Sequence, residues 1–151
     1  MRSKRILVAL VALLVGVTSL TVYAQVQRPY RQGSVWNLAF IRMKPGMDAA
    51  YLTYVATTWK ANQEASKKEG LIVSYKVLTT EAHSPTDFNI ILMTEYKDQA
   101  TMEANVSKAD ALLQKMQGDD AKQMQGYKER GEIREIMADR IAREMVLEPR
   151  P

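Results

Sequence analysis

The sequence predicts one α+β domain in which an antiparallel sheet packs against helices, and three observations lead to this fold class. Several short stretches alternate apolar and polar residues with the period of two that is typical of strands. Two longer stretches carry apolar residues at spacings of three and four, as amphipathic helices do. The first 24 residues have the pattern of a signal peptide, so a domain of about 127 residues follows.

Residues 1–24 are predicted to be a cleavable signal peptide. Three positive residues and no acid open the chain: Arg2, Lys4 and Arg5. An apolar run from Ile6 to Val17 and a polar stretch follow. Val22 and Ala24 then place small side chains at positions −3 and −1 of the cleavage site. The alternative is a retained anchor, but Ile6–Val22 only just reaches the length that spans a bilayer. We therefore expect an exported protein, periplasmic or secreted, without a stable membrane anchor.

Charge and cysteine content restrict the partners and the stabilising chemistry of the domain. Without its leader the chain has 18 basic and 17 acidic residues, so its basic character comes mostly from the signal peptide. This near-neutral balance gives no reason to expect a nucleic-acid partner. The chain has no Cys, which rules out disulfides and thiol catalysis, and we expect the core and an oligomer interface to supply the stability.

The first elements of the domain are expected between residues 25 and 70. Residues 25–33 are polar, contain Pro29 and Gly33, and are predicted to be a flexible tether to the domain 34–151. A strand is expected over 34–43, with Trp36, Leu38, Phe40 and Arg42 on one face and Val35, Asn37, Ala39 and Ile41 on the other. Lys44-Pro45-Gly46 ends it, and residues 47–68 predict a helix that stops at Gly70.

Two strands, a helix, a further helical segment and a final strand are expected in the rest of the chain. Alternation predicts strands over 71–79 and 88–96, joined by the turn-rich loop 80–87. An apolar stripe predicts a helix over 98–117, and Gly118-Asp119-Asp120 is expected to be a turn that caps a further charged helical segment, about 120–138. The pattern over 133–147 fits either a helix or a strand, and we expect a final strand over 140–147.

This order, strand-helix-strand-strand-helix-strand, is the ferredoxin-like βαββαβ unit. The block Phe40–Gly46, the aromatic helix after it, and the strands Leu71–Leu78 and Phe88–Lys97 resemble the dimeric α/β-barrel superfamily, which includes the antibiotic-biosynthesis-monooxygenase-like domains. The resemblance spans about residues 34–147. It implies a homodimer in which two sheets pair into one barrel. An open sheet that is apolar on both faces leads to the same expectation.

His83, in the loop 80–87, is the weak candidate for a catalytic residue, as a general base or a haem ligand. The alternative is an exposed loop residue. Some barrels of this superfamily that act on haem use an Asn, a Trp and a His, and this chain has Asn37, Trp59 and His83. The resemblance places that His on the second helix, however, so it assigns these three residues no catalytic role, and no cofactor is expected.

A small-molecule pocket is predicted between the sheet and the first helix. Its expected lining is Trp36, Asn37, Tyr54, Trp59 and Tyr75, although the sequence does not decide which sheet face is the inner one. An aromatic stripe such as Tyr51, Tyr54 and Trp59 also suits a core, and Asn37 and Arg42 also suit a dimer interface.

Carboxylates repeat every three residues at Glu129, Glu132 and Glu135, a spacing that could hold a hard cation. Interleaved Arg130 and Arg134 favour an ion-paired, solvated helix face, and no metal site is expected. The chain also lacks phosphate-cradling and nucleophile-elbow motifs.

Two functions from different classes follow. The first is an exported dimer that binds a small apolar or aromatic ligand, or a protein. The alternative is a cofactor-independent monooxygenase or isomerase, in which His83, Tyr75 or Glu95 would act as the base. A structural dimer without a ligand is a third possibility. The sequence decides neither the ligand nor whether the protein is an enzyme.

Overall fold

A computed structural model describes residues 29–148. The expected signal peptide, 1–24, lies outside these residues. Residues 32–146 form one compact unit, and the described ends, 29–31 and 147–148, belong to another. In the latter, the Glu148 N–H donates to the Pro29 carbonyl at 3.0 Å, and Arg31 and Glu148 form an ion pair at 2.9 Å. Within residues 29–148, no helix has the length and apolar character needed to span a bilayer.

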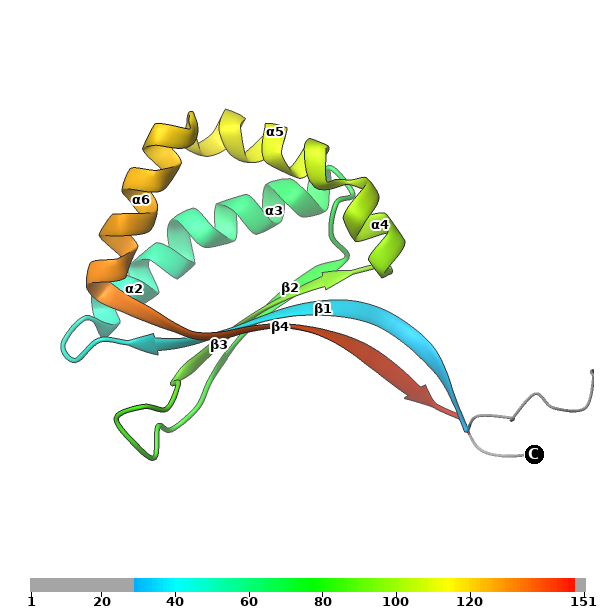
Figure 1. The fold of residues 1–151 in the computed structure, drawn as a ribbon, viewed down its shortest axis with the longest axis horizontal. Helices are drawn as coiled ribbons and strands as arrows, with labels where there is room; N and C mark the ends of the chain where they lie inside the picture. Colours follow the sequence, from blue (N-terminus) through cyan, green and yellow to red (C-terminus); the bar gives the residue numbers. More distant parts are fainter. Residues whose placement is uncertain (1–28, 149–151) are drawn as a thin grey trace, which may run out of the picture. The chain divides into compact units, whose positions relative to one another are not determined.

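Four strands and two helical connections, α2 to α3 and α4 to α6, follow the ferredoxin-like order (Figure 1). The elements are β1 (Tyr30–Met43), α2 (Asp48–Tyr54), η1 (Val55–Trp59), α3 (Lys60–Lys68), β2 (Ser74–Thr79), β3 (Ile90–Tyr96), α4 (Gln99–Ala104), α5 (Val106–Gln117), α6 (Asp120–Ile133) and β4 (Arg134–Leu147). The strands lie in the order β2-β3-β1-β4. The predicted α+β, ferredoxin-like fold is therefore confirmed.

The sheet is antiparallel. In β1 and β3, Val35 lies opposite Tyr96 and Ile41 opposite Ile90, while β2 pairs with β3 on its other side. β1 and β4 are also antiparallel. The Lys44 N–H donates to the Ile133 carbonyl, and two residues earlier in β1 Arg42 pairs with Glu135, two residues later in the chain than Ile133. Figure 1 shows the helices of this unit on one face of the sheet.

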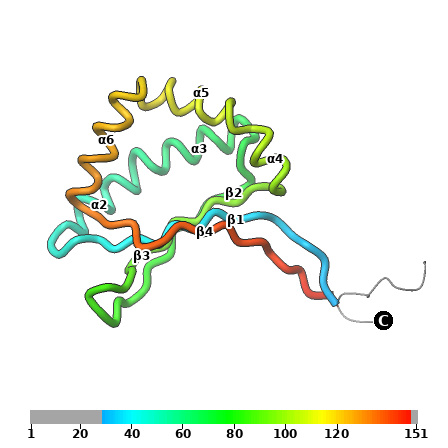
Figure 2. The backbone as a smooth tube through the Cα atoms, viewed as in Figure 1, coloured from blue at the N-terminus to red at the C-terminus, as the bar shows by residue number. Residues whose placement is uncertain are grey.

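The core lies between the sheet and the helix formed by α2, η1 and α3, which Figure 2 shows as one continuous path. Its buried residues come from β1, β3 and this helix: Ile41, Tyr51, Val55, Ile90 and Leu92. Because side chains alternate along a strand, the residues next to these in sequence point to the opposite face. Trp36, Leu38 and Phe40 of β1 therefore lie on the face that no helix within the described residues covers.

Turns and caps form where the sequence predicts them. Gly46 and Gly70 have φ of 77° and 70°, a region that residues with a Cβ rarely adopt, and they follow β1 and end α3. The Asp119 carboxylate accepts a hydrogen bond from the Lys122 N–H at 3.0 Å, so the predicted cap of α6 is confirmed.

Several boundaries differ from the expectation. Residues 30–33, expected in the tether, begin β1, and a Cβ on Gly33 would lie 2.5 Å from Glu144 Oε2. Residues 71–73 precede β2 rather than open it, because the Leu71 N–H bonds the Ser66 carbonyl at the end of α3. The predicted helix 98–117 breaks at Asn105.

The C-terminal segment, which the sequence allowed to be a helix or a strand, is a strand from Arg134 to Leu147. β4 begins at Arg134, so the helical expectation for 134–138 is wrong. Hydrogen bonding of β4 to β1 in the sheet outweighs the helical spacing of the apolar side chains in this segment.

We expect Ile90→Ala to lower the free energy of unfolding by about 2–5 kcal/mol, because Ile90 is 0% exposed and its loss leaves a cavity in the core. The control is Ile136→Ala in β4, where the side chain is 42% exposed and the cost should be below about 1 kcal/mol. Urea denaturation followed by circular dichroism, at one protein concentration, measures both. Equal losses would contradict this account of the core.

Candidate functional site

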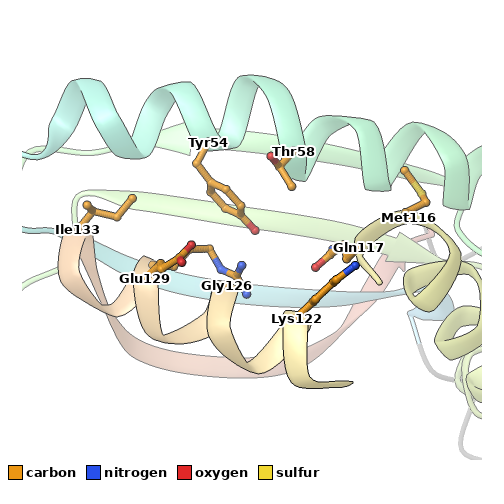
Figure 3. A pocket seen from close by; sticks show the side chains of 9 residues that line it. Tyr54, Thr58, Met116, Gln117, Lys122, Gly126, Glu129 and Ile133 are labelled. Atoms are coloured by element: carbon orange, nitrogen blue, oxygen red, sulfur yellow. The ribbon is translucent and has the colours of Figure 1, made fainter. Parts of the chain in front are cut away.

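A cleft of about 400 Å³ lies between the first helix and the last one. Figure 3 shows Tyr54 and Thr58 reaching into it from one side and Lys122, Glu129 and Ile133 lining the other. Met116 and Gln117, at the end of α5, close one end. Two apolar side chains, one aromatic ring and a small number of polar groups thus surround a cavity of the size that suits an organic molecule.

The wall of the cleft that carries Thr58 is the π-helical segment η1. The Thr53 and Thr57 hydroxyls each donate to a carbonyl four residues earlier, at 2.7 Å, and such bonds compete with the regular helical ladder. Single π-turns inside α-helices occur frequently at functional sites. Here the segment follows Tyr54 directly and supplies the next lining residue of the cleft.

Beside the cleft, three tyrosine rings and two guanidinium groups form one cluster, called here the Tyr–Arg cluster: Tyr51, Tyr54, Tyr127, Arg130 and Arg134. Tyr51 and Tyr54 stack with ring centroids 5.9 Å apart. Arg130 Cζ lies 5.2 Å from the centre of the Tyr54 ring, and Arg134 Cζ lies 5.9 Å from that of Tyr51. Cation–π attraction of this kind joins α2 to α6 and to the start of β4.

The cluster contains buried polar atoms that have no hydrogen-bond partner. These are the Tyr51 hydroxyl and the Nε atoms of Arg130 and Arg134, and no other buried side-chain nitrogen or oxygen within residues 29–148 shares this property. Buried polar groups are almost always paired, so each exception calls for an explanation such as a bound water or ligand. Burial raises the pKa of Tyr51 from 10.0 to about 12, although the positive charge of Arg134 opposes this increase.

Around the cleft, the glutamates Glu129 and Glu135 have partners, whereas the arginines Arg130 and Arg134 form no ion pair among the described residues. Glu129 accepts a hydrogen bond from the Gln125 amide at 3.0 Å, and Glu135 pairs with Arg42 at 2.5 Å. Within the described part of the chain, neither Arg130 nor Arg134 lies within 4.0 Å of a carboxylate oxygen. The expected pairing of these glutamates with the interleaved arginines is therefore not found among the described residues, and Glu135, which lies in β4, pairs with Arg42 of β1 instead. In that same part of the chain, no group of three or more His, Asp or Glu residues is placed to hold a metal ion.

The predicted pocket residues fall into separate places. Tyr54 lines the cleft. The rings of Trp59 and Tyr75 meet edge to face, with their centroids 5.4 Å apart. The Tyr75 hydroxyl donates a hydrogen bond to Glu64, which raises the pKa of Tyr75. Trp36 lies on the opposite face of the sheet, where Lys76 Nζ is 5.3 Å from its ring centre.

The other two candidates lie away from these contacts. Asn37 lies opposite Thr94 in the β1–β3 pair. His83 is exposed in the loop between β2 and β3, where its backbone N–H donates to the Asp87 carboxylate at 3.2 Å, and it does not line the cleft.

Sequence reasoning missed the α6 side of the site. Tyr127 and Arg130 are three residues apart on α6, as Tyr51 and Tyr54 are on α2, and Arg134 opens β4 directly after α6. Tyr interleaved with Arg was a usable signal, but the neighbouring glutamates gave the same segment an ion-paired interpretation. Only tertiary contact shows that the arginines meet tyrosines of α2 instead.

No family model matches the chain, and no curated protein matches it. Two solved structures are similar. HapK from Hahella chejuensis aligns with a TM-score of 0.47 and 12% sequence identity, over 73% of this chain and 91% of that one. A dimeric ferredoxin-like protein from an uncultured marine organism aligns with a TM-score of 0.37 and 17% identity, over 78% of this chain and 95% of that one. The assignment of the fold rests on strand order and register rather than on these likenesses.

We expect Tyr51→Phe to raise the free energy of unfolding at neutral pH by about 1 kcal/mol, because it removes a buried hydroxyl without a partner and keeps the ring. Because the pKa of Tyr51 is about 12 in the folded protein and ordinarily 10.0, the folded state keeps its full stability below pH 10 and loses part of it as the pH rises through 12. The variant should lack that loss.

Denaturation curves at pH 7 and pH 11 measure both effects. The control is Tyr127→Phe, whose side chain is 54% exposed, and it should change stability by less than about 0.5 kcal/mol. A Tyr51→Phe protein less stable than the wild type at pH 7 would mean that the hydroxyl has a partner.

Proposed function

We propose that this protein is an exported binding domain that holds a small organic molecule with an aromatic part in the cleft between η1 and α6. The observation that carries the proposal is the cleft itself, about 400 Å³ with apolar walls from Met116 and Ile133 and a ring from Tyr54. Binding sites for small molecules combine such walls with a few polar groups that fix the orientation of the ligand.

Binding is favoured over catalysis because the described cleft assembles no acid–base pair. Its titratable residues are Tyr54, Lys122, Glu129 and Arg130, and the hydrogen bond found for Glu129 is to the Gln125 amide. A catalytic base normally bonds the group that it activates or a residue that orients it. The cofactor-independent monooxygenase or isomerase therefore stays an untested alternative.

We also propose that the domain acts as a homodimer in which two uncovered sheet faces meet, as the resemblance to dimeric α/β barrels implies. The register aligns Leu38 with Met93 and Phe40 with Ile91, and Leu78 of β2 lies next to Ile91. This apolar row lies on the face opposite the helices, where burial against a second copy would remove it from water. The cleft lies on the other face, so ligand binding and dimerisation use separate surfaces.

The proposed dimer predicts that Leu38→Glu converts it to a monomer at micromolar concentration, because a carboxylate without a partner would be buried in the interface. Sedimentation velocity measures the change. The control, Leu52→Glu, places the same charge at a 42% exposed position in α2 and should stay dimeric. A monomeric wild type would contradict the dimer and leave the cleft unaffected.

The binding function predicts that protein purified from an exporting host carries a small molecule. Native mass spectrometry should show a chain that begins at Gln25 and a reproducible added mass. Thr58→Trp, which fills the cleft from η1, should lose that mass, whereas Ala56→Trp, an exposed position of η1 outside the lining, should keep it. An added mass that survives Thr58→Trp would place the ligand elsewhere, and the absence of any added mass would count against a tightly bound ligand.

A further inference from the structure

We infer that the cleft recognises its ligand by a single negative charge, and that the ligand class is an aromatic monocarboxylate. This inference rests on the proposed function, because it names the ligand of the same cleft. It depends on three properties of the Tyr–Arg cluster and its neighbours: unpaired guanidinium groups, the balance of charge among the lining residues, and the placement of Gly126.

The arginines are held in place without being neutralised. Arg130 Cζ lies 5.2 Å from the Tyr54 ring centre and 6.0 Å from that of Tyr127, so aromatic rings flank its guanidinium group. Arg134 lies 5.9 Å from the ring centres of both Tyr51 and Tyr127. Stacking uses the faces of a guanidinium group and leaves its N–H edge for hydrogen bonds. No described carboxylate takes up that edge on either arginine.

The fork of N–H groups on an arginine matches the two oxygens of a carboxylate, and such bidentate bonds are the strong ones in proteins. Arg130 lines the cleft, and its Nε is buried without a hydrogen-bond partner. A ligand carboxylate that enters the cleft would therefore meet a cation that is already oriented by packing. Less conformational entropy is lost on binding when the receptor side chain is held in this way.

Charge balance decides between a singly and a doubly charged ligand. The charged residues that line the cleft are Lys122, Arg130 and Glu129, which leave one net positive charge. Arg134 contributes to the same cluster without lining the cleft. A monocarboxylate would neutralise the net charge of the lining residues, whereas a phosphate monoester with two charges would leave one net negative charge in the cleft.

The rest of the lining suits an aromatic body. The Tyr54 ring offers a face for stacking, and Met116 and Ile133 supply apolar walls. A Cβ at position 126 would lie 3.1 Å from Arg130 Nη1, so a larger residue there would shift the guanidinium group by a few tenths of an ångström. The cleft thus has apolar walls that suit the ring of a ligand and a positive charge, on Arg130, that suits its carboxylate.

A matched pair of probes tests the charge alone: 2-naphthoate and its neutral amide, 2-naphthamide, which has nearly the same shape. Isothermal titration with the full mature protein, at pH 7 and low salt, should give an affinity about tenfold or more higher for the acid. Arg130→Gln should remove this preference, so that the acid and the amide bind with affinities within about twofold of each other. The control Arg140→Gln changes the net charge equally at an exposed position of β4 outside the cleft, and it should keep the preference.

A second pair of variants covers the case in which Arg130→Gln fails to fold. Gly126→Ala and Gly131→Ala both add a methyl group to α6 and both favour the helix. A Cβ at position 126 would crowd Arg130 Nη1, whereas nothing lies within 4 Å of one at position 131. We expect Gly126→Ala to weaken binding of 2-naphthoate at least threefold more than it weakens binding of the amide, and Gly131→Ala to alter neither.

Different results would overturn different parts of the account. Equal affinities for acid and amide, both lost in Thr58→Trp, would overturn the charge preference and keep the cleft as a binding site. Tighter binding of the acid that Arg130→Gln and Gly126→Ala leave unchanged would place the recognition elsewhere and overturn the inference. Failure of both probes to bind at millimolar concentration would overturn the inference together with the proposed function for aromatic ligands.

Discussion

Tyr51 is the residue on which the arrangement of this domain depends most. Its side chain is 0% exposed and packs in the core beside Ile41 and Ile90, so it ties α2 to the sheet. Its ring also stacks on Tyr54 and lies under the Arg134 guanidinium group, so it ties α2 to the start of β4. One side chain thereby joins the apolar core to the edge of the cleft, and the stability of one depends on the packing of the other.

The position of Tyr51 between the core and the cleft explains why a buried side chain there carries a polar group. Hydrophobic packing of the Tyr51 ring stabilises the fold, while its unpartnered hydroxyl costs free energy. The neighbouring guanidinium groups carry the same kind of cost, because their Nε atoms are buried without hydrogen bonds. Real proteins retain such local conflicts mostly where function requires them, and the cluster borders the cleft to which we assign binding.

The sequence predicted the fold well because its strands and helices have clear periods. Alternation in 34–43 and 88–96 assigned the two central strands and their faces, and the predicted stop at Gly70 is confirmed by its positive φ. Residues 134–138 were misassigned because Ile133, Ile136 and Met137 have helical spacing, and pairing of β4 with β1 is a long-range contact that no local pattern reveals.

The site was predicted less completely than the fold, for a related reason. Tyr54 was named and lines the cleft, but Trp36 lies on the other face, and which face is inner depends on where the helices pack. Arg130 and Arg134 were recognised only as partners of the neighbouring glutamates. Their contacts with Tyr54 and Tyr51 join segments that are far apart in sequence, so they become visible only in three dimensions.

The two glycines of α6 have a consequence for the dynamics of the domain. Gly126 and Gly131 together lower the intrinsic stability of this helix by roughly 2 kcal/mol relative to alanine, and none of its residues is fully buried. A helix held this weakly opens more readily than the core beneath it, and its amide protons exchange with solvent sooner. Any molecule that bridges η1 and α6 therefore makes the opening of that helix less favourable, so occupancy of the cleft and the local unfolding of one of its walls are a single coupled equilibrium.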